Sequence, residues 1–455
     1  MIGKHLLFTL RSFKKNILYA VLVVGGLAIG ITTFLSTVQW SAWHLTYDRD
    51  YPEAERIYRM TFEEINDGFY RHTARILHGS ALSRILFSEQ ISGVDSWGRL
   101  APFRKAAIII GEDSYYERQV YACDPGFLSI FAPRFLRGDP EQALHEPHTA
   151  IMTRSAAGKY FGDRDPVGAT FELIHQFEIK PEVYTVTGIV EDFPGNSHLN
   201  ISVLTSFINP VEYEGTAWAY LKLSPGADPV AVEQYVKKFL VDNVQDPYTD
   251  RIHPRLMPAG RIHLHSHLAR ELQPNTRFRT VMVMLVTGIL VFLLAWFNFT
   301  LLSYSQNQLQ IRKLVVQWQM GAGRRVFFNQ FLTDNLFVGI IALAAGILFT
   351  LSVRPAIQSL GGHFIFQDRN LVIASIFLLL LLIIAGSLTT AAISTGRLYR
   401  YLQQRYLSSR MGPPPDTAGR NLFVRAVILL EFAVTFVLVS NLLMITRQTR
   451  FAMDQ

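Results

Sequence analysis

The chain has 455 residues, of which 49% are hydrophobic and only 17% are charged, and its formal net charge is +7. This balance suits a protein that is partly embedded in a membrane and has more than one folding unit. The basic surplus lies beside long apolar segments, which argues for membrane lipid and against nucleic acid as its partner. The single cysteine, Cys123, excludes an intrachain disulfide, and we expect it to be a buried small apolar residue.

The first 40 residues predict two helices. Residues 1–16 predict a cytoplasmic interfacial helix, because their apolar residues share one helical face. Residues 17–40 supply the ~20 apolar residues that a helix needs to cross a bilayer, and they predict transmembrane helix 1. This segment is too long for the apolar region of a signal peptide, and no small-residue cleavage site follows it. Gly26 and Gly30 have the spacing of a close helix–helix contact.

The long segment at 41–278 predicts a water-exposed domain. Residues 107–110 and 184–190 have the composition of strands. Residues 153–160 and 228–241 predict helices. Strands mixed with isolated helices predict an α+β fold, and the segment is long enough for two small subdomains with separate cores.

Three histidines, His263, His265 and His267, alternate along a segment that predicts a strand. On a strand they would share one face, as the ligands of a metal ion would. No cluster of cysteines or carboxylates accompanies them. We therefore expect no metal site, and interpret the segment as a strand that returns to the membrane.

The C-terminal part predicts four more apolar spans. Residues 279–396 predict transmembrane helices 2–4, with a cytoplasmic segment at 305–329 between helices 2 and 3. A Pro-rich cytoplasmic linker follows at 397–421, then transmembrane helix 5 at 422–445 and a periplasmic tail at 446–455. The fold class is thus an α-helical membrane protein of about five transmembrane helices, with a large α+β periplasmic domain inserted between helices 1 and 2.

Lysine and arginine predict the sides of the membrane. They cluster before helix 1, after helix 2 and after helix 4, in segments that hold almost no acid. By the positive-inside rule these three segments are cytoplasmic. Residues 41–278 and the C-terminus then lie outside, and we expect a multi-pass protein of a bacterial inner membrane.

Polar residues inside the predicted spans allow two interpretations. Asn298, Asp334, Asn335 and Glu431 fall within or at the start of these spans. Intramembrane polar groups normally face a bundle interior and need partners there. A proton relay is one interpretation. Interhelical hydrogen bonds, each contributing about 1 kcal/mol or less, are the interpretation that we favour.

A set of short motifs resembles MacB/FtsX-type ABC transporter permeases. The segments that carry the resemblance are residues 16–30, 47–48, 56–59 (RIYR), 127–140, 157–162 (AGKYFG), 193–198 (FPGNSH) and 262–266 (IHLHS). The resemblance implies a MacB-like periplasmic core domain at 41–278 and an FtsX-like permease block at 279–396. Larger members of this family contain that unit twice, and here only helix 5 resembles the start of a second copy. A piece of a longer chain and a genuine half-size permease both remain open.

The resemblance implies a mechanotransmission function, in which a separate cytoplasmic ATPase moves the helices and the outer domain moves with them. No Gly-x-x-x-x-Gly-Lys-Ser/Thr loop is present, so we expect ATP to be bound by a partner subunit and no cofactor by this chain. No Gly-x-Ser-x-Gly elbow is present either, and we expect the chain not to be an enzyme.

By resemblance, the segment 305–329 is the coupling helix that contacts the ATPase. The residues expected to make this contact are Arg312, Lys313, Gly321, Arg324 and Arg325. The alternative is an interfacial helix whose arginines only satisfy the positive-inside bias. The family usually has Glu where Lys313 aligns, and residues 317–320 also depart from its pattern, so coupling is expected to be altered or weak.

The expected partners are the ATPase, a second copy or a related permease, and a periplasmic adaptor, substrate or hydrolase. Efflux or export of a peptide, lipoprotein or small toxic molecule is the function that we favour. The alternatives are a non-transport regulator that activates a periplasmic cell-wall enzyme, and a membrane receptor that works without an ATPase.

Overall fold

The computed structural model describes residues 17–66, 69–74, 91–103, 105–174, 181–208, 216–243, 251–309, 311–359 and 369–408, and five single helical residues beyond them. The predicted interfacial helix at 1–16, the part of the linker after residue 408 and nearly all of transmembrane helix 5 lie outside the described residues. Residues 397–408, which were predicted as linker, instead continue helix α11 (Arg369–Ser408). The chain divides into two compact units, residues 42–281 and the remainder. Each unit is described by itself.

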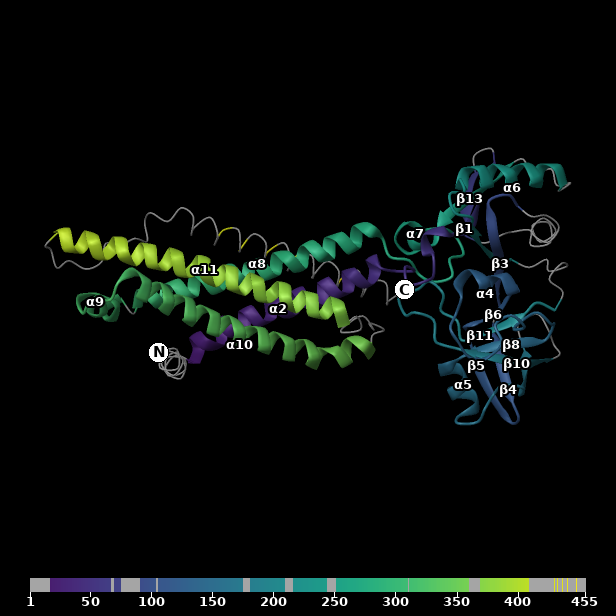
Figure 1. The fold of residues 1–455 in the computed structure, drawn as a ribbon, viewed down its shortest axis with the longest axis horizontal. Coiled ribbons are helices and arrows are strands. Elements are labelled where there is room, and N and C mark those ends of the chain that lie inside the picture. The colour runs from purple at the N-terminus through teal and green to yellow at the C-terminus, as the bar shows by residue number, and fades with distance from the viewer. Residues whose placement is uncertain are drawn as a thin grey trace. The chain divides into compact units, whose positions relative to one another are not determined.

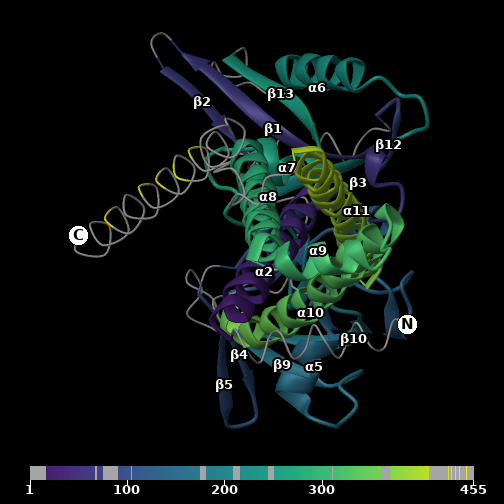
Figure 2. The same ribbon diagram turned by 90° about the vertical axis from the view of Figure 1, so that its left-hand side faces the viewer.

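The second of these units is helical. Its long helices are α2 (Ile17–Leu45), α8 (Phe278–Leu309), α10 (Arg324–Ser359) and α11 (Arg369–Ser408), and a short helix, α9 (Ile311–Gln319), precedes α10. In the described part of the chain, these four long helices are each apolar over enough residues to cross a membrane. Helix α2 continues five residues past the predicted end of the first span. The four lie side by side within this unit (Figures 1 and 2).

Helix α2 is the centre of this bundle. Its buried face, which includes Leu27, Ile31 and Leu35, packs into one apolar cluster with side chains of α8, α10 and α11. The apolar stretch of α2 is 44% buried, against 17% for that of α8. The face of α8 that contacts no other described helix is therefore the one left for lipid or for another protein.

Glycines bring these helices close together. A Cβ atom added at Gly346 of α10 would lie 2.8 Å from Ile31 of α2, and one added at Gly339 would lie 2.6 Å from Ile383 of α11. Added Cβ atoms at Gly30, Gly288 and Gly386 would overlap Ala295, Thr37 and Trp296, respectively. In a membrane, where helices gain little from hydrophobic burial, such close approach supplies the packing energy.

The expected close contact at Gly26 is not seen among the described residues. No heavy atom of the described chain lies within 4 Å of a Cβ built there, whereas Gly30 does contact α8.

The unit at 42–281 is an α+β domain, as predicted. Its strands are β1 (Ile57–Asn66), β2 (Phe69–Thr73), β3 (Val94–Pro102), β4 (Ala106–Ile110), β5 (Asp113–Glu117), β6 (Val120–Cys123), β7 (Phe135–Gly138), β8 (Thr149–Thr153), β9 (Thr170–Ile174), β10 (Glu182–Val190), β11 (Val203–Ser206), β12 (Trp218–Leu223) and β13 (Ile252–Pro258). Its helices are η1 (Ala54–Arg56), α4 (Pro125–Phe131), α5 (Arg154–Phe161), α6 (Pro229–Asn243) and α7 (Ala259–His265). The strands predicted at 107–110 and 184–190 and the helices predicted at 153–160 and 228–241 are confirmed.

The described strands are hydrogen-bonded into one sheet. Its order is β13-β1-β12-β3-β6-β11-β8-β10-β9-β4-β5, with β2 beside β1 and β7 beside β10. Two pairs, β10 with β8 and β11 with β6, are parallel, and the other named pairs are antiparallel. The expected division into two subdomains is not seen as two sheets, because β3, β6 and β11 join the halves through continuous backbone pairing.

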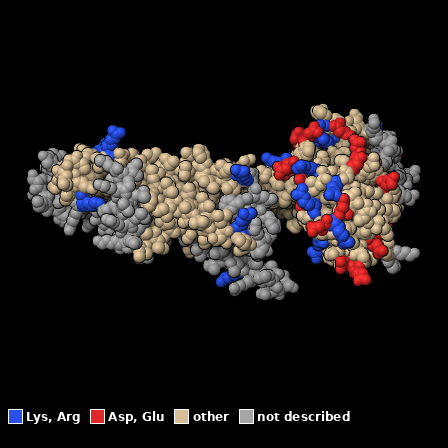
Figure 3. All heavy atoms as spheres, turned by 60° about the horizontal axis from the view of Figure 1, so that its bottom comes forward, with Lys and Arg blue, Asp and Glu red and all other residues tan. Residues whose placement is uncertain are grey.

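Separate buried clusters nevertheless lie along this sheet. One is centred on Phe127 and Phe131 of α4 and includes the fully buried Cys123, another lies between the sheet and α5, and a third lies under α6. Helix α6 lies along β13 in Figure 1, where α5 lies beside β10. Charged side chains gather on the domain, whereas uncharged residues cover most of the long helices (Figure 3).

The prediction of a histidine-bearing strand is wrong. His263 and His265 lie on helix α7, which ends at His265, and the strand that precedes it is β13. At helical spacing His263 is buried and His265 is exposed, so the histidines do not share one face. Among the described residues, no group of three or more His, Cys, Asp or Glu side chains could hold a metal ion.

Candidate functional site

A buried polar network lies just after α2 in the domain. Asp48 has a positive φ of 60° and is 1% exposed. Its Oδ1 accepts hydrogen bonds from the Ser197 hydroxyl at 2.7 Å and from the His198 backbone N–H at 2.9 Å. The backbone N–H of Asp48 in turn donates to the Asn196 carbonyl at 2.8 Å. The motifs at 47–48 and 193–198 therefore meet, although about 150 residues separate them.

Two tyrosines complete this network. Tyr51 lies 2.6 Å from the Ser197 hydroxyl, and Tyr220 lies 2.7 Å from His198 Nε2. Burial raises the pKa of both tyrosines well above its usual value, and the Asp48 carboxylate raises it further. We call Asp48, Tyr51, Ser197, His198 and Tyr220 the clasp.

The clasp is not a catalytic triad. The Ser197 hydroxyl donates to Asp48 and not to an imidazole nitrogen, and His198 Nε2 is bonded to Tyr220. His198 Nδ1 lies 2.8 Å from the same Asp48 oxygen. A nucleophile also needs a path to substrate, and Ser197 is buried. The network's physical effect is to hold two distant chain segments together.

The segment before α8 is fastened beside the clasp. His263 of α7 stacks on Tyr47, with ring centroids 3.6 Å apart, and its Nε2 lies 2.6 Å from His44 Nδ1. Burial, together with the neighbouring His44, lowers the pKa of His263 to about 4. Burial raises the pKa of Tyr47 to about 12. At neutral pH the histidine is therefore uncharged, as an imidazole within such a stack should be.

A buried ion pair secures the same region. Arg59 of β1 is fully buried, and its guanidinium donates to Glu271 at 2.6 and 3.0 Å and to the Ser266 hydroxyl at 2.9 Å. The carbonyl of His263 also accepts a hydrogen bond from the Thr276 backbone N–H at 3.0 Å. The residues that leave α2 and those that lead to α8 are thus fixed to one part of the domain.

The segment between α8 and α10 forms an amphipathic helix and a tight turn. Leu314 of α9 is buried in a cluster with Phe327 and Phe331 of α10 and with Leu398 and Leu402 of α11. The opposite side exposes Val316 at 53% and Met320 at 84%. Apolar side chains therefore lie on both the packed side and the exposed side of α9 and the turn after it.

Gly321 ends α9. The Ala322 backbone N–H donates to the Gln317 carbonyl and the Gly321 N–H to the Trp318 carbonyl, which is the hydrogen-bond pattern of a Schellman motif. The φ of Gly321 is +91°, a conformation that strains residues with a Cβ atom. The local backbone conformation therefore explains why glycine occupies position 321, whether or not this residue also contacts an ATPase.

The other predicted coupling residues divide into two groups. Arg324 and Arg325 are exposed in the first turn of α10. Lys313 is half-buried, burial lowers its pKa, and the Asp334 carboxylate opposes that shift. Lys313 and Asp334 therefore interact within the chain. The side chain of Arg312 lies outside the described residues.

The predicted intramembrane polar residues are also not alike. Asn335 is 5% exposed, and its Nδ2 has no hydrogen-bond partner in the part of the chain that the structure describes. Asn298 is exposed on α8, contrary to the expected inward orientation, because α8 is the least buried of the four long helices. Glu431 lies outside the described residues.

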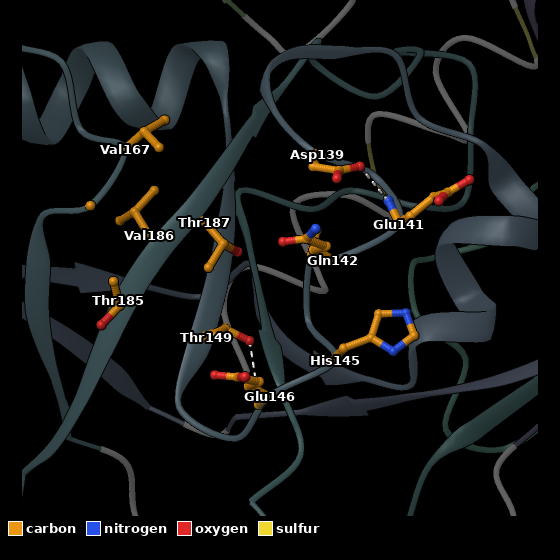
Figure 4. A pocket seen from close by; sticks show the side chains of 12 residues that line it. Asp139, Glu141, Gln142, His145, Glu146, Thr149, Val167, Thr185, Val186 and Thr187 are labelled. Atoms are coloured by element: carbon orange, nitrogen blue, oxygen red, sulfur yellow. Dashed lines mark hydrogen bonds between the residues drawn. The ribbon is translucent and has the colours of Figure 1, made fainter.

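A pocket of about 560 Å³ opens on the domain surface. The loop after β7 contributes Asp139, Glu141, His145 and Glu146, and β10 contributes Thr185 and Thr187 from the other side (Figure 4). The Thr149 hydroxyl donates to the Glu146 carbonyl at 2.7 Å, and Asp139 accepts from the Glu141 N–H at 3.0 Å. No lysine or arginine lines the pocket, so its electrostatics favour cations.

These features define a class of protein: a membrane-embedded chain that carries an α+β domain between its first and second apolar helices. A family model described as the MacB-like periplasmic core domain matches residues 20–239. Residues 20–239 are therefore similar to this domain, which confirms the resemblance seen in the sequence and points to an ABC-type permease or a related family member. A comparison with curated protein sequences finds no match.

Three solved structures are similar to the domain. A domain of a candidate permease protein from Porphyromonas gingivalis is 22% identical, with a TM-score of 0.38, over 46% of this chain and 92% of that one. The periplasmic region of MacB from Actinobacillus actinomycetemcomitans is 14% identical, with a TM-score of 0.32, over 45% and 90% of the two chains. The extracellular domain of the noncanonic ABC-type transporter YknZ from Gram-positive bacteria is 11% identical, with a TM-score of 0.32, over 44% and 99%.

Proposed function

We propose that the chain is the permease subunit of an ABC-type mechanotransmission complex of the bacterial inner membrane, with its domain in the periplasm. A separate cytoplasmic ATPase would bind the turn between α9 and α10 and bind the ATP. The observation that carries the proposal is the exposed apolar and basic surface of this turn, formed by Val316, Met320, Arg324, Arg325 and Val326. We call these five residues the elbow.

The elbow exposes large apolar side chains that the packing of its own segment does not use. Met320 is 84% exposed and Val326 is 52% exposed, while the core of the same segment is already filled by Leu314 and Phe327. Exposed apolar side chains next to charged ones are typical of a surface that binds another protein. Methionine suits such a surface because its flexible thioether adapts to the partner.

The positions of the two elbow arginines are also unfavourable for the stability of helix α10. Arg324 and Arg325 occupy the first turn of α10, which contains no acidic residue. A cation at a helix N-terminus is unfavourable by about 0.3–1 kcal/mol, because the N-terminal end of the helix dipole is positive. Carboxylates of a bound partner would offset this repulsion, which supports a docking role for these two residues.

The connections of the domain to helices α2 and α8 also support the proposal. The clasp and the Tyr47–His263 stack fix the chain segments after α2 and before α8 to one part of the domain. Movement of those two helices would therefore be passed to the domain by two connections and not absorbed by loose linkers. We propose export or efflux as the process driven, with a second copy or a related permease completing the complex.

Charge reversal tests the proposal. The double variant Arg324→Glu/Arg325→Glu should reduce the recovery of a P-loop ATPase with the tagged full chain about thirtyfold, since each reversed charge weakens a charge-complementary interface by about 1 kcal/mol. Recovery is measured by quantitative mass spectrometry after native purification in mild detergent. Arg400→Glu, an exposed residue of α11, is the matched control and should retain the ATPase.

Two results would contradict the proposal. One is full ATPase recovery with the double variant, which would remove the elbow from the interface. The other is no ATPase recovery with the wild-type chain, which would favour an ATPase-independent receptor.

A further inference from the structure

Four arginines between α7 and the first turn of α8 have no acidic partner. Arg261, Arg270, Arg277 and Arg279 are all exposed, and none forms an ion pair with another described residue. The one acidic residue between 259 and 281 is Glu271, which is bound to the buried Arg59. This stretch of the domain surface therefore has a net positive charge that the other described residues do not neutralise.

Three of these arginines lie next to one ring pair in sequence or within one helical turn of it. His265, the last residue of α7, stacks on Phe278, the first residue of α8, with ring centroids 5.7 Å apart. Arg277 and Arg279 flank Phe278 in sequence, and Arg261 lies one helical turn before His265 on α7. We call Arg261, Arg277 and Arg279 the basic collar.

The basic collar lies where the chain enters the membrane. The apolar stretch of α8 begins at Phe278, so Arg277 and Arg279 are at its end by covalent connection alone. Phe278 is 42% exposed, as expected of an aromatic ring at a membrane interface. Arginine side chains near a helix end extend their guanidinium groups to the level of the lipid headgroups.

Topology does not account for these charges. The positive-inside bias concentrates arginine on the cytoplasmic side of a membrane. If α8 crosses the membrane once, the basic collar at its start and the elbow after its end lie on opposite sides. The bias that explains the arginines of the elbow therefore does not explain those of the basic collar. Guanidinium groups bind phosphate oxygens through paired N–H donors, and they do so better than ammonium groups because the fork matches the phosphate geometry. Phosphate is therefore the chemistry that this surface fits.

We propose that the basic collar binds the phosphate groups of anionic phospholipids in the leaflet that faces the domain. The lipid headgroups would hold the α7–α8 junction at a fixed depth. The proposal rests on α8 as a membrane span and does not depend on an ATPase, so the two proposals can fail separately.

Lipid retention tests this proposal. The purified full chain is equilibrated in micelles that contain equal amounts of phosphatidylglycerol and phosphatidylcholine with identical acyl chains, and native mass spectrometry counts the retained molecules of each. The wild-type chain should retain phosphatidylglycerol in preference. Arg261→Gln/Arg277→Gln/Arg279→Gln should lower that preference at least fivefold, because each arginine near a charged lipid surface contributes about fivefold in affinity.

A matched variant removes the same charge elsewhere on the domain. Arg134, Arg137 and Arg154 are exposed, with 76%, 61% and 64% of their side chains accessible. Their triple substitution by glutamine should leave the preference unchanged. The cytoplasmic arginines are present in all three proteins and contribute an equal background.

The proposal is overturned if the basic collar variant keeps the wild-type preference, if the matched variant loses as much, or if the wild-type chain shows no preference. Unfolding temperatures of the three proteins show whether a loss reflects misfolding, and exposed positions such as these should leave them within a few degrees.

Discussion

The domain and the helical unit bury their interiors by different physical means. In the domain, polar groups are buried together and hydrogen-bonded to one another, as Asp48 Oδ1 is to the Ser197 hydroxyl and to the His198 backbone N–H in the clasp. In the helical unit, glycines allow close approach, as at Gly346 against Ile31. A buried polar network requires particular hydrogen-bonding partners, whereas a close glycine contact requires that no larger side chain occupies that position. The domain is therefore vulnerable to lost hydrogen bonds and the helical unit to added volume.

Removal of the Asp48 carboxylate should have the largest effect. Asp48→Ala leaves the Ser197 hydroxyl and the His198 backbone N–H without their acceptor and removes the carboxylate beside the buried imidazole, and should lower the free energy of unfolding of the domain by about 3–5 kcal/mol. Denaturant unfolding followed by the near-UV signal of the domain measures this. Asp50→Ala is the control, since Asp50 is exposed and accepts one bond from Asn196 at 3.2 Å. Equal stability of the two variants would show that the clasp does not stabilise the domain.

Added volume at Gly386 should have the next largest effect. A Cβ at this position would overlap the Trp296 ring, so Gly386→Val should destabilise the helical unit by about 1–3 kcal/mol through overpacking. Gly396→Val on the same helix is the control, because nothing lies within 4 Å of a Cβ there. Unfolding of the bundle in mixed micelles measures the difference. Equal loss in both variants would attribute the effect to helix propensity and not to the contact.

Acid should weaken the His263 stack. The pKa of His263 is about 4 in the folded chain, below the ordinary value of about 6.5, so between these two values the unfolded chain binds more protons. Stability is therefore full above pH 6.5, falls as the pH drops towards 4, and levels off below it, with a loss of about 1–2 kcal/mol after allowance for solvent screening.

The variant His263→Phe isolates this titration from others in the domain. It removes the group that gains a proton on unfolding, so its stability should depend less on pH between 6.5 and 4 than that of the wild type. His267→Gln, at an exposed position, should retain the wild-type profile. Identical profiles for His263→Phe and the wild type would mean that His263 does not titrate as the stack requires.

A strained residue at the end of α9 should have the smallest effect. Gly321→Ala meets no neighbouring atom but must adopt a φ of +91°, which costs about 1 kcal/mol. Gly323→Ala, also without a neighbour within 4 Å and without a positive φ, is the control. Thermal unfolding of the helical unit should separate them by a few degrees, and no separation would contradict the assignment of Gly321 as the helix stop.

The sequence predicted the elements that depend on local patterns. The four described spans follow from runs of ~20 apolar residues, and strands such as β10 follow from their β-branched composition. The histidine pattern failed because alternation over three residues fits the start of a helical turn as well as a strand, and the Pro258-Ala259-Gly260 entry to α7 was not weighed.

Long-range pairs could not be predicted. Asp48 and His198 are 150 positions apart, and nothing local distinguishes a clasp carboxylate from a surface one, since only the fold brings Ser197 to it. Lys313 and Asp334 were assigned to different functions because they fall on either side of a predicted membrane boundary. Resemblance found the segments at 47–48 and 193–198, and the structure supplies the physical reason that they occur together.

A photocrosslink from the elbow tests the central claim most directly. A photoreactive phenylalanine analogue in place of Met320, the most exposed apolar residue of the turn, is activated in intact cells, and the adducts are identified by mass spectrometry. The same analogue at Phe377, an exposed residue within the apolar stretch of α11, is the control. We expect a P-loop ATPase to be crosslinked from position 320 and none from position 377. Adducts from position 320 that contain lipid alone would contradict the proposed coupling role.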